Sequence, residues 1–294
     1  MTGANSGIGY ATSHALAKLG ARVVLLCRNP ERGEAAARSI RQATANPEVE
    51  SFRLDLSSLA DVDAAVAELR CERVDVLVHN AGQLPAERLE SVDGLELAFA
   101  THVAGPHQLT RGLRPALERT PGARVIWVSS GGMLTQRLNT SDPQWRKRSY
   151  DGVVAYAETK RAQVVLAELW ADRLRKAGVE SCSMHPGWAD TAAVARSLPR
   201  FHQLTEAILR TPAQGADTVV WLAASEAARG ARGRFYFDRE PARTHWLPWT
   251  RETEAERYAL WEICENPERQ GNPSCVRSRP HGPGHSNGSR SGNT

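Results

Sequence analysis

The sequence predicts an α/β fold in which a doubly wound parallel sheet forms a single domain. Short runs rich in Val, Leu and Ile alternate along the 294 residues with longer segments of helical spacing, which is typical of repeated strand and helix units. The runs are apolar almost throughout, as expected of strands that helices cover on both faces. A glycine-rich segment, TGANSGIG, opens the first helical segment.

The expected elements follow one another in strict alternation. The apolar runs predict strands at residues 22–27, 49–54, 74–79, 124–129, 179–184 and 232–238. The helical spacing predicts helices at residues 7–19, 31–43, 58–70, 93–118, 153–177 and 212–224, with a last helix near 252–265. This order indicates a Rossmann-type sheet.

The composition changes near Asn266 to Pro, Gly, Ser, Asn, Arg and His. Such a segment buries too little apolar surface to offset the entropy lost on ordering. We therefore expect one folded domain over residues 1–265 and a disordered tail over residues 266–294.

Charge and cysteine content exclude several kinds of protein. Of the formal net charge of +4, three units come from Arg277, Arg279 and Arg290 in the tail, which leaves about +1 for the body and predicts no nucleic-acid partner. No apolar run reaches the roughly 18 to 20 residues of a membrane span, and the first residues lack a secretory signal, so we expect a cytoplasmic protein. The five scattered cysteines predict neither disulfides nor a metal site.

The glycine segment predicts a dinucleotide site. Gly3, Gly7 and Gly9 let backbone N–H groups approach a pyrophosphate at the start of a helix. Arg28 follows the next expected strand, where a site for NAD(H) carries Asp or Glu, and its guanidinium can pair with a 2′-phosphate. We therefore expect NADP(H). The alternative for Arg28 is an ordinary exposed arginine before a helix cap at Asn29.

The position of the glycine segment has a consequence for the sheet. Such a segment follows a hydrophobic strand, yet here it starts at residue 2, so we expect the sheet to lack its first, central strand. That strand contributes about ten ladder hydrogen bonds and several buried side chains at roughly 1.5–3 kcal/mol each. Total stability is only about 5–15 kcal/mol. We interpret the chain as an N-terminally truncated form, and we expect an added N-terminal strand to raise its melting temperature.

Tyr156 and Lys160 stand four residues apart in an expected helix, so both side chains emerge on one face. An adjacent ammonium and an oxidised nicotinamide both favour the tyrosine anion, and we expect them to lower the pKa of Tyr156. Ser130 ends the strand before this helix and can donate a hydrogen bond to a carbonyl group. The structural alternative for the pair is chance spacing.

Other polar and glycine residues also follow expected strands, at the edge where open α/β sheets bind ligands. Asn80, Ala81 and Gly82 follow one strand, and the segment from His185 to Thr191 follows another. We expect Thr191 to reach a bound amide and His185 to be a packed core residue.

Six motifs in this order resemble those of the short-chain dehydrogenase/reductase family over residues 2–240: TGANSGIG, LDLS, NAG, VSS, YAETK and PGWADT. The resemblance implies hydride transfer between a nicotinamide and the carbonyl or alcohol of a small molecule. Tyr156 would be the proton donor, Lys160 its tuner and ribose anchor, and Ser130 the group that polarises the carbonyl. Beside Arg28, Tyr156 and Lys160, the implied cofactor contacts are Gly3, Asn5, Ser6, Gly7, Ile8, Gly9, Asp55, Leu56, Asn80, Ala81, Gly82, Pro186, Gly187 and Thr191.

One residue departs from the family pattern. His102 stands where most members carry an asparagine that holds a water between the lysine and solvent. We expect reduced turnover from this change, and we expect His102→Asn to raise turnover.

Three further expectations concern substrate, partner and class. Apolar residues between Val194 and Thr211 predict a lid over a hydrophobic substrate, or alternatively a segment packed on the body. The resemblance suggests a homodimer paired through residues 93–118 and 153–177. The alternative function is a catalytically impaired or non-catalytic scaffold of the same fold. A sugar-nucleotide epimerase fits poorly because its glycine spacing differs and no larger C-terminal substrate domain follows.

Overall fold

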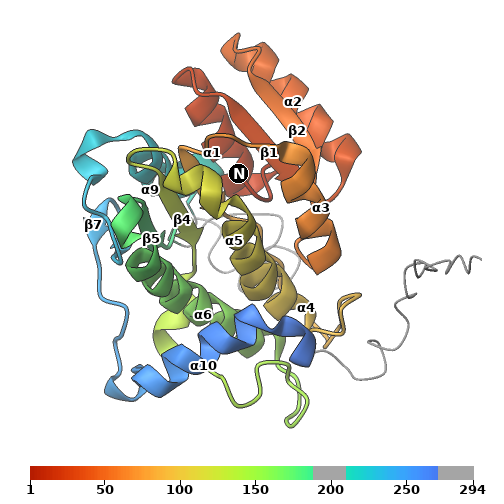
Figure 1. Cartoon of the computed structure of the whole chain (residues 1–294), viewed down its shortest axis with the longest axis vertical. Helices are drawn as coiled ribbons and strands as arrows, with labels where there is room; N and C mark the ends of the chain where they lie inside the picture. Colours follow the sequence, from red (N-terminus) through yellow and green to blue (C-terminus); the bar gives the residue numbers. More distant parts are fainter. Residues whose placement is uncertain (188–209, 271–294) are drawn as a thin grey trace, which may run out of the picture.

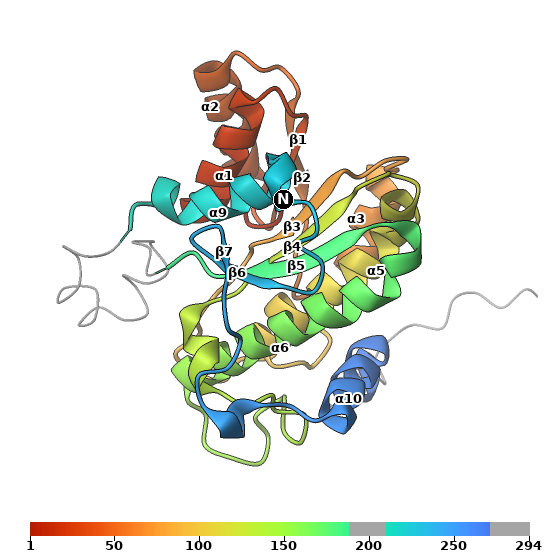
Figure 2. The ribbon, with the colours of Figure 1, turned by 90° about the vertical axis from the view of Figure 1, so that its left-hand side faces the viewer.

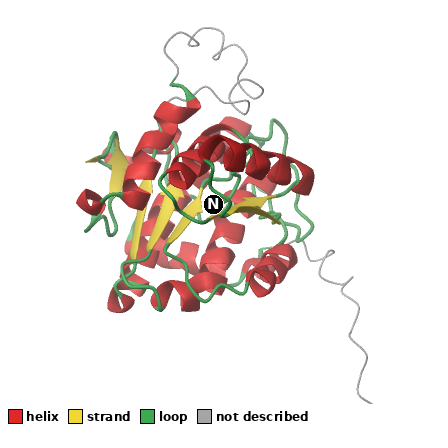
Figure 3. Cartoon of the chain, turned by 90° about the horizontal axis from the view of Figure 1, so that it is seen from above, coloured by secondary structure: helices red, strands yellow, loops and turns green. Residues whose placement is uncertain are grey.

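Helices cover both faces of a mostly parallel sheet in the computed structural model (Figure 1 and Figure 3). The structure describes residues 1–187 and 210–270. The predicted lid residues, Thr191 and most of the predicted tail lie outside the described residues, whereas residues 266–270 include a 3₁₀ turn at Pro267–Arg269. The α/β class and the Rossmann-type arrangement are confirmed.

The strands that the sequence predicts all form inside their predicted ranges. They are β1 (Val23–Cys27), β2 (Val49–Arg53), β3 (Val76–His79), β4 (Arg124–Val128), β5 (Glu180–Met184) and β6 (Phe235–Phe237). The short strand β7 (Glu240–Pro241) was not predicted, and it pairs antiparallel with β6 through a turn in which Asp238 and Arg239 have positive φ.

The helices also lie where the spacing places them, with one interruption. They are α1 (Gly7–Lys18), α2 (Pro30–Thr44), α3 (Leu59–Leu69), α6 (Gly152–Arg173), α9 (Pro212–Ala224) and α10 (Glu254–Glu265). The expected helix over residues 93–118 is instead α4 (Leu97–Phe99), a π turn at Ala100–Ala104, and α5 (Gly105–Glu118). Side-chain oxygens of Asn29, Ser58 and Asp151 cap α2, α3 and α6.

The sheet is divided between β1 and β3. β1 pairs with β2, and β3 begins a second sheet in the order β3-β4-β5-β6-β7. Met1 and Thr2 lie between the two sheets: the Met1 carbonyl accepts from the Leu26 amide at 2.8 Å, and the Thr2 amide donates to the Val78 carbonyl at 3.0 Å. The N-terminus therefore sits in the middle of the strands (Figure 3).

Two hydrophobic clusters fill the two faces of the sheet. One joins the strands to α3, α5, α6 and α10, and the other joins them to α1, α2 and α9. Figure 2 shows α1 and α9 on one side of the strands and α3, α5 and α6 on the other. Met1 itself is buried in the second cluster. No helix among the described residues has the length and apolar character needed to span a bilayer.

The middle of helix α6 is covered on every side by its own chain. Every residue from Thr159 to Ala167 is buried, although this run covers more than two turns. Arg161 donates to the Thr244 carbonyl at 2.6 Å, so residues 242–250 lie along α6. α10 adds a further cover, with its Trp261 ring 5.1 Å from that of Trp170 (Figure 2). The middle of α6, inside the dimer surface expected over residues 93–118 and 153–177, therefore has no free face, and the homodimer stays a prediction.

Candidate active site

The glycine segment forms a cradle at the start of α1. Gly3 and Gly7 have φ of +61° and +55°, which side chains rarely tolerate. A Cβ atom on Gly9 would lie 2.3 Å from the Gly3 carbonyl oxygen, so the turn closes only around glycine. Ser6 precedes the helix and makes no side-chain cap bond. Asn5 and Ile8 lie in the same turn.

This cradle fits the pyrophosphate of a dinucleotide. The first amides of a helix have no partner within the helix and carry partial positive charge. α1 has no acidic residue in its first turn, and no side-chain cap occupies its free amides. The donors present are therefore those that an anion needs, and we infer that a nicotinamide dinucleotide would bind with its phosphates here.

Asn80 ties the end of β3 to the glycine segment. Its amide nitrogen donates to the Thr2 carbonyl at 3.0 Å and to the Gly3 carbonyl at 3.2 Å. The Thr2 hydroxyl accepts in return from the Asn80 backbone amide at 2.9 Å and from the Ala81 amide at 3.1 Å. The amide hydrogens of Asn80 are thus used to join two loops, and Gly82 continues the segment beside Lys160.

The residues expected at the adenosine end lie at the ends of β1 and β2. Arg28 is exposed directly after β1, and no carboxylate of the described residues pairs with it. Asp55 accepts from the Ser57 amide at 3.0 Å and from the Ser57 hydroxyl at 2.7 Å, which fixes the turn after β2. Leu56 is buried in that turn. Arg28 is therefore free to meet a phosphate.

Ser130, Tyr156 and Lys160 come together after β4. The Ser130 hydroxyl lies near enough to Tyr156 to lower the pKa of its phenol, and the Lys160 ammonium lies 5.5 Å from the centre of the Tyr156 ring. The Lys160 ammonium donates to the Val128 carbonyl at 2.9 Å, so β4 holds the lysine that α6 presents. The Ser129 hydroxyl donates to the Lys160 carbonyl at 2.8 Å and fixes the helix to the same strand.

Burial is the main influence on the protonation of Tyr156 and Lys160. Burial raises the pKa of Tyr156 above its ordinary 10.0, and only the Ser130 hydrogen bond acts to lower it. Burial lowers the pKa of Lys160 to about 7. In this state the phenol keeps its proton, because desolvation outweighs the opposing influence of Ser130.

His102 joins the NAG segment to the catalytic helix. Its Nε2 accepts from the Gln83 amide at 2.9 Å, so the proton lies on Nδ1, which donates to the Thr159 hydroxyl at 2.8 Å. That hydroxyl donates to the Tyr156 carbonyl at 2.7 Å. Burial holds the pKa of His102 well below its ordinary value, so the ring is neutral. The hydrogen bonds of the ring therefore lead to the Gln83 backbone amide and, through the Thr159 hydroxyl, to the Tyr156 backbone carbonyl.

The segment after β5 closes the site from another side. The His185 ring stacks on Phe237 at 4.3 Å, and its Nδ1 accepts from the Gly187 amide at 3.0 Å. Burial lowers the pKa of His185 to about 4. Gly187 has φ of +77°, and a Cβ there would lie 2.7 Å from Arg210. Pro186 stands between these residues, and Thr191 lies outside the described residues.

Several residues of the site were not predicted from the sequence. Thr2 and Gln83 join loops by bonds to residues far along the chain, which no local pattern shows. Gln163 accepts from Lys160 at 2.9 Å and could have been found, because it lies one helical turn after the lysine.

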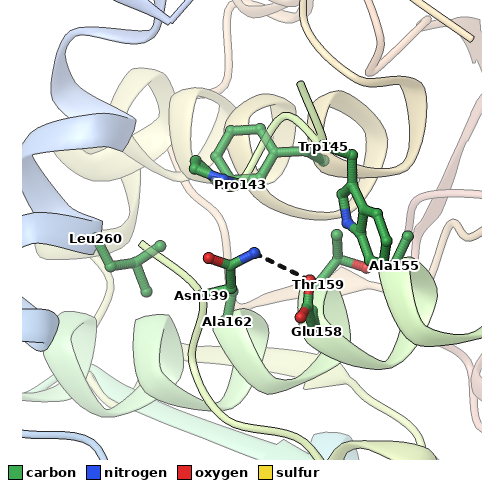
Figure 4. A pocket seen from close by; sticks show the side chains of 9 residues that line it. Asn139, Pro143, Trp145, Ala155, Glu158, Thr159, Ala162 and Leu260 are labelled. Carbon is green, nitrogen blue, oxygen red and sulfur yellow. Dashed lines mark hydrogen bonds between the residues drawn. The ribbon is translucent and has the colours of Figure 1, made fainter. Parts of the chain in front are cut away.

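A separate pocket lies between α6, the loop before it and α10 (Figure 4). Asn139, Pro143, Trp145 and Leu260 are among its lining residues, and none of the predicted site residues lines it. Asn139 donates to Glu158 across it at 3.2 Å. We therefore place no chemistry there.

The sequence is similar to known proteins along most of its length. The model of the short chain dehydrogenase family matches residues 1–200. Dehydrogenase/reductase SDR family member 12 of Bos taurus is 46% identical over 274 residues, which cover 92% of this chain and 86% of that protein. Retinol dehydrogenase 13 of Mus musculus is 34% identical over 251 residues, which cover 81% of this chain and 74% of that protein.

Solved structures agree with these relatives. An uncharacterized protein from Mycobacterium Paratuberculosis has a TM-score of 0.73 and 27% identity, with 92% of this chain and 93% of that chain covered. A short chain dehydrogenase from Escherichia coli CFT073, complexed with NADPH, has a TM-score of 0.64 and 25% identity, with 80% and 93% covered. The chain therefore belongs to the short-chain dehydrogenase/reductase family, whose members are oxidoreductases.

Proposed function

We propose that this protein is an NADP(H)-dependent oxidoreductase that transfers hydride between the nicotinamide and a carbonyl or alcohol group of an apolar small molecule. The observation that carries the proposal is the convergence of Ser130, Tyr156 and Lys160 after β4, on a fold whose α1 presents a glycine cradle. A phenol, an ammonium and a hydroxyl at one point can hold a carbonyl oxygen and exchange a proton with it.

The phosphate preference rests on Arg28. It is exposed at the end of β1, and no described carboxylate neutralises it. A guanidinium in that place favours a 2′-phosphate through charge-assisted hydrogen bonds. The Escherichia coli relative complexed with NADPH supports the same cofactor. The cradle would hold the pyrophosphate, and Lys160 would reach the ribose beside Gly82.

The chemistry divides between cofactor and protein. When bound, the nicotinamide supplies or accepts the hydride. Ser130 would donate a hydrogen bond to the substrate oxygen, and the Tyr156 hydroxyl would give that oxygen a proton as it gains charge. The raised pKa of Tyr156 keeps the phenol protonated at neutral pH, which suits a proton donor in the direction of reduction.

We assign His102 a positioning role instead of a place in a proton path. Its two ring bonds hold the backbone at Gln83 and the turn of α6 that carries Tyr156 at fixed separation. His102→Asn tests this assignment. A lower kcat with an unchanged pH profile would support positioning, whereas a higher kcat would support the proton path that the resemblance implies.

The substrate class rests on the relatives. Retinol dehydrogenases 11 and 13 of Mus musculus are 30% and 34% identical over most of this chain, and retinol is an apolar alcohol. We therefore propose an apolar carbonyl compound or alcohol as the substrate.

Cofactor titration tests the proposal directly. Purified protein is titrated with NADPH and with NADH while the fluorescence of the bound nicotinamide is followed. We expect NADPH to bind about tenfold or more tightly, since one guanidinium–phosphate contact supplies about 1.5–3 kcal/mol. Arg28→Ala should remove the difference, and Arg38→Ala, on the exposed part of α2, should keep it. Absence of binding by either nucleotide would contradict the proposal.

A further inference from the structure

Lys160 is held by neutral acceptors alone. Its side chain is buried, and its ammonium donates to the Val128 carbonyl and to Oε1 of Gln163, each at 2.9 Å. No carboxylate of the described residues forms an ion pair with it. Gln163 is therefore the one side chain of the described residues that the structure shows accepting a hydrogen bond from this ammonium.

The rest of Gln163 is not satisfied. The residue is fully buried, and its Nε2 has no hydrogen-bond partner among the described residues. An unpaired amide in the core costs free energy that an apolar side chain of the same size would not. Packing therefore gives no reason for a glutamine here, whereas the bond from its oxygen to Lys160 does.

We propose that Gln163 is a positioning residue for Lys160: its amide oxygen holds the ammonium next to Gly82 and Tyr156 without fixing the charge of the lysine. A carboxylate at this position would form a buried ion pair, and an apolar side chain would leave one N–H without an acceptor. The neutral amide of Gln163 accepts the hydrogen bond without adding a negative charge beside the lysine. The inference rests on the proposed role of Lys160 in hydride transfer.

Two titratable side chains lie around Lys160 in the described residues. Tyr156 is on the same helix, with its ring centre 5.5 Å from Nζ, and His102 comes from the π turn packed against α6. Both are neutral in this state, since burial raises the pKa of Tyr156 and lowers that of His102. A change in charge at Gln163 would therefore act on the lysine with little competition.

The chain allows a direct measurement because it contains only four lysines, Lys18, Lys147, Lys160 and Lys176. Lysine labelled with ¹³C at Cε gives one NMR signal for each, and the signal lost in Lys160→Met belongs to Lys160. The titration of that signal is followed from pH 5 to pH 10 in the full chain and in Gln163→Glu and Gln163→Met. Gln108→Met is the matched control, since Gln108 is a buried glutamine that bonds Leu59 and Asp63 instead.

We expect the midpoint for Lys160 to rise by about one pH unit or more in Gln163→Glu and to fall in Gln163→Met. Gln108→Met should leave it unchanged. The proposal would be overturned if the Lys160 midpoint moved in the same direction in both Gln163 variants, or if it moved in neither of them. If one of the two Gln163 variants does not fold, the other decides alone. Its Lys160 midpoint must then shift in the direction stated for it.

A second readout separates this inference from the proposed function. The Kd for NADPH is measured across the same pH range, and its pH dependence should move with the Lys160 midpoint. Absence of NADPH binding in the parent protein would contradict the proposed function, while the lysine titration would still decide the role of Gln163.

Discussion

The two parts of the sheet are held in different ways. β1 and β2, with α1 and α2, are joined to the strands after them through hydrogen bonds of Met1, Thr2 and Gly3 and through the hydrophobic cluster shared with α9, because β1 and β3 do not pair. β3, β4 and β5 pair continuously, and α6 lies against them under a cover of residues 242–265. We call these the nucleotide half and the catalytic half.

The two halves differ in how firmly the structure positions the proposed catalytic side chains and the proposed nucleotide site. Tyr156 and Lys160 are positioned by a helix that is buried around more than two turns. The glycine cradle is positioned by three residues and by the side chain of Asn80. The catalytic groups should therefore tolerate perturbation of the fold better than nucleotide binding does.

The largest expected effect leaves both halves folded and removes the proposed proton donor. Tyr156→Phe should lower kcat by about 10²–10⁴, the range typical of a positioned acid or base. Its melting temperature should stay close to that of the parent, because the ring remains. Tyr258→Phe, at a tyrosine that is 65% exposed on α10, should leave kcat unchanged. If Tyr156→Phe retained its turnover, Tyr156 would not be the proton donor that we propose.

The next change opens the cover of the catalytic half. Trp261 lies between Trp170 and the Arg173 guanidinium, which is 3.4 Å from the centre of its ring. Trp261→Ala should cost about 3 kcal/mol of unfolding free energy, the lower end for loss of a large aromatic side chain. Urea unfolding measures this cost. Trp249→Ala is the control, because Trp249 is 63% exposed. An equal loss of unfolding free energy in Trp261→Ala and Trp249→Ala would contradict a specific stabilisation of α6 by α10.

A smaller loss is expected where the halves meet. Asn80→Ala removes two hydrogen bonds and leaves two loop carbonyls unpaired, at a cost of about 2–3 kcal/mol. Asn46→Ala removes three hydrogen bonds, all of them within the nucleotide half. We expect both variants to melt earlier and only Asn80→Ala to weaken NADPH binding. Equal affinities of Asn80→Ala and Asn46→Ala for NADPH would mean that the Asn80 hydrogen bonds do not position the glycine cradle.

The order of strands and helices follows from local chemistry. Apolar runs, helical spacing and caps such as Asn29 and Asp151 act within a few residues, so their outcome can be seen in the sequence. The site residues at strand ends were found for the same reason, because a parallel sheet brings its carboxyl ends to one edge. Tyr156 and Lys160 needed only the repeat of one helix.

The features that local patterns did not show all depend on distant residues. The helix predicted over residues 93–118 is interrupted by a π turn that contains His102, whose ring bonds a residue 57 positions away. Segments from the end of the domain cover the middle of α6. Burial raises the pKa of Tyr156 because packing removes water from it, an effect that spacing along a helix does not show.

The sequence by itself determined the succession of elements, the glycine cradle and the pairing of Tyr156 with Lys160, since each depends on neighbours within a turn or a strand. Only the tertiary structure decided how Met1 and Thr2 join two sheets, which groups keep their protons, and why Gln163 faces the lysine amine. Those outcomes depend on burial and on contacts between segments far apart in the chain, where loss of water sets the free energy of every polar group.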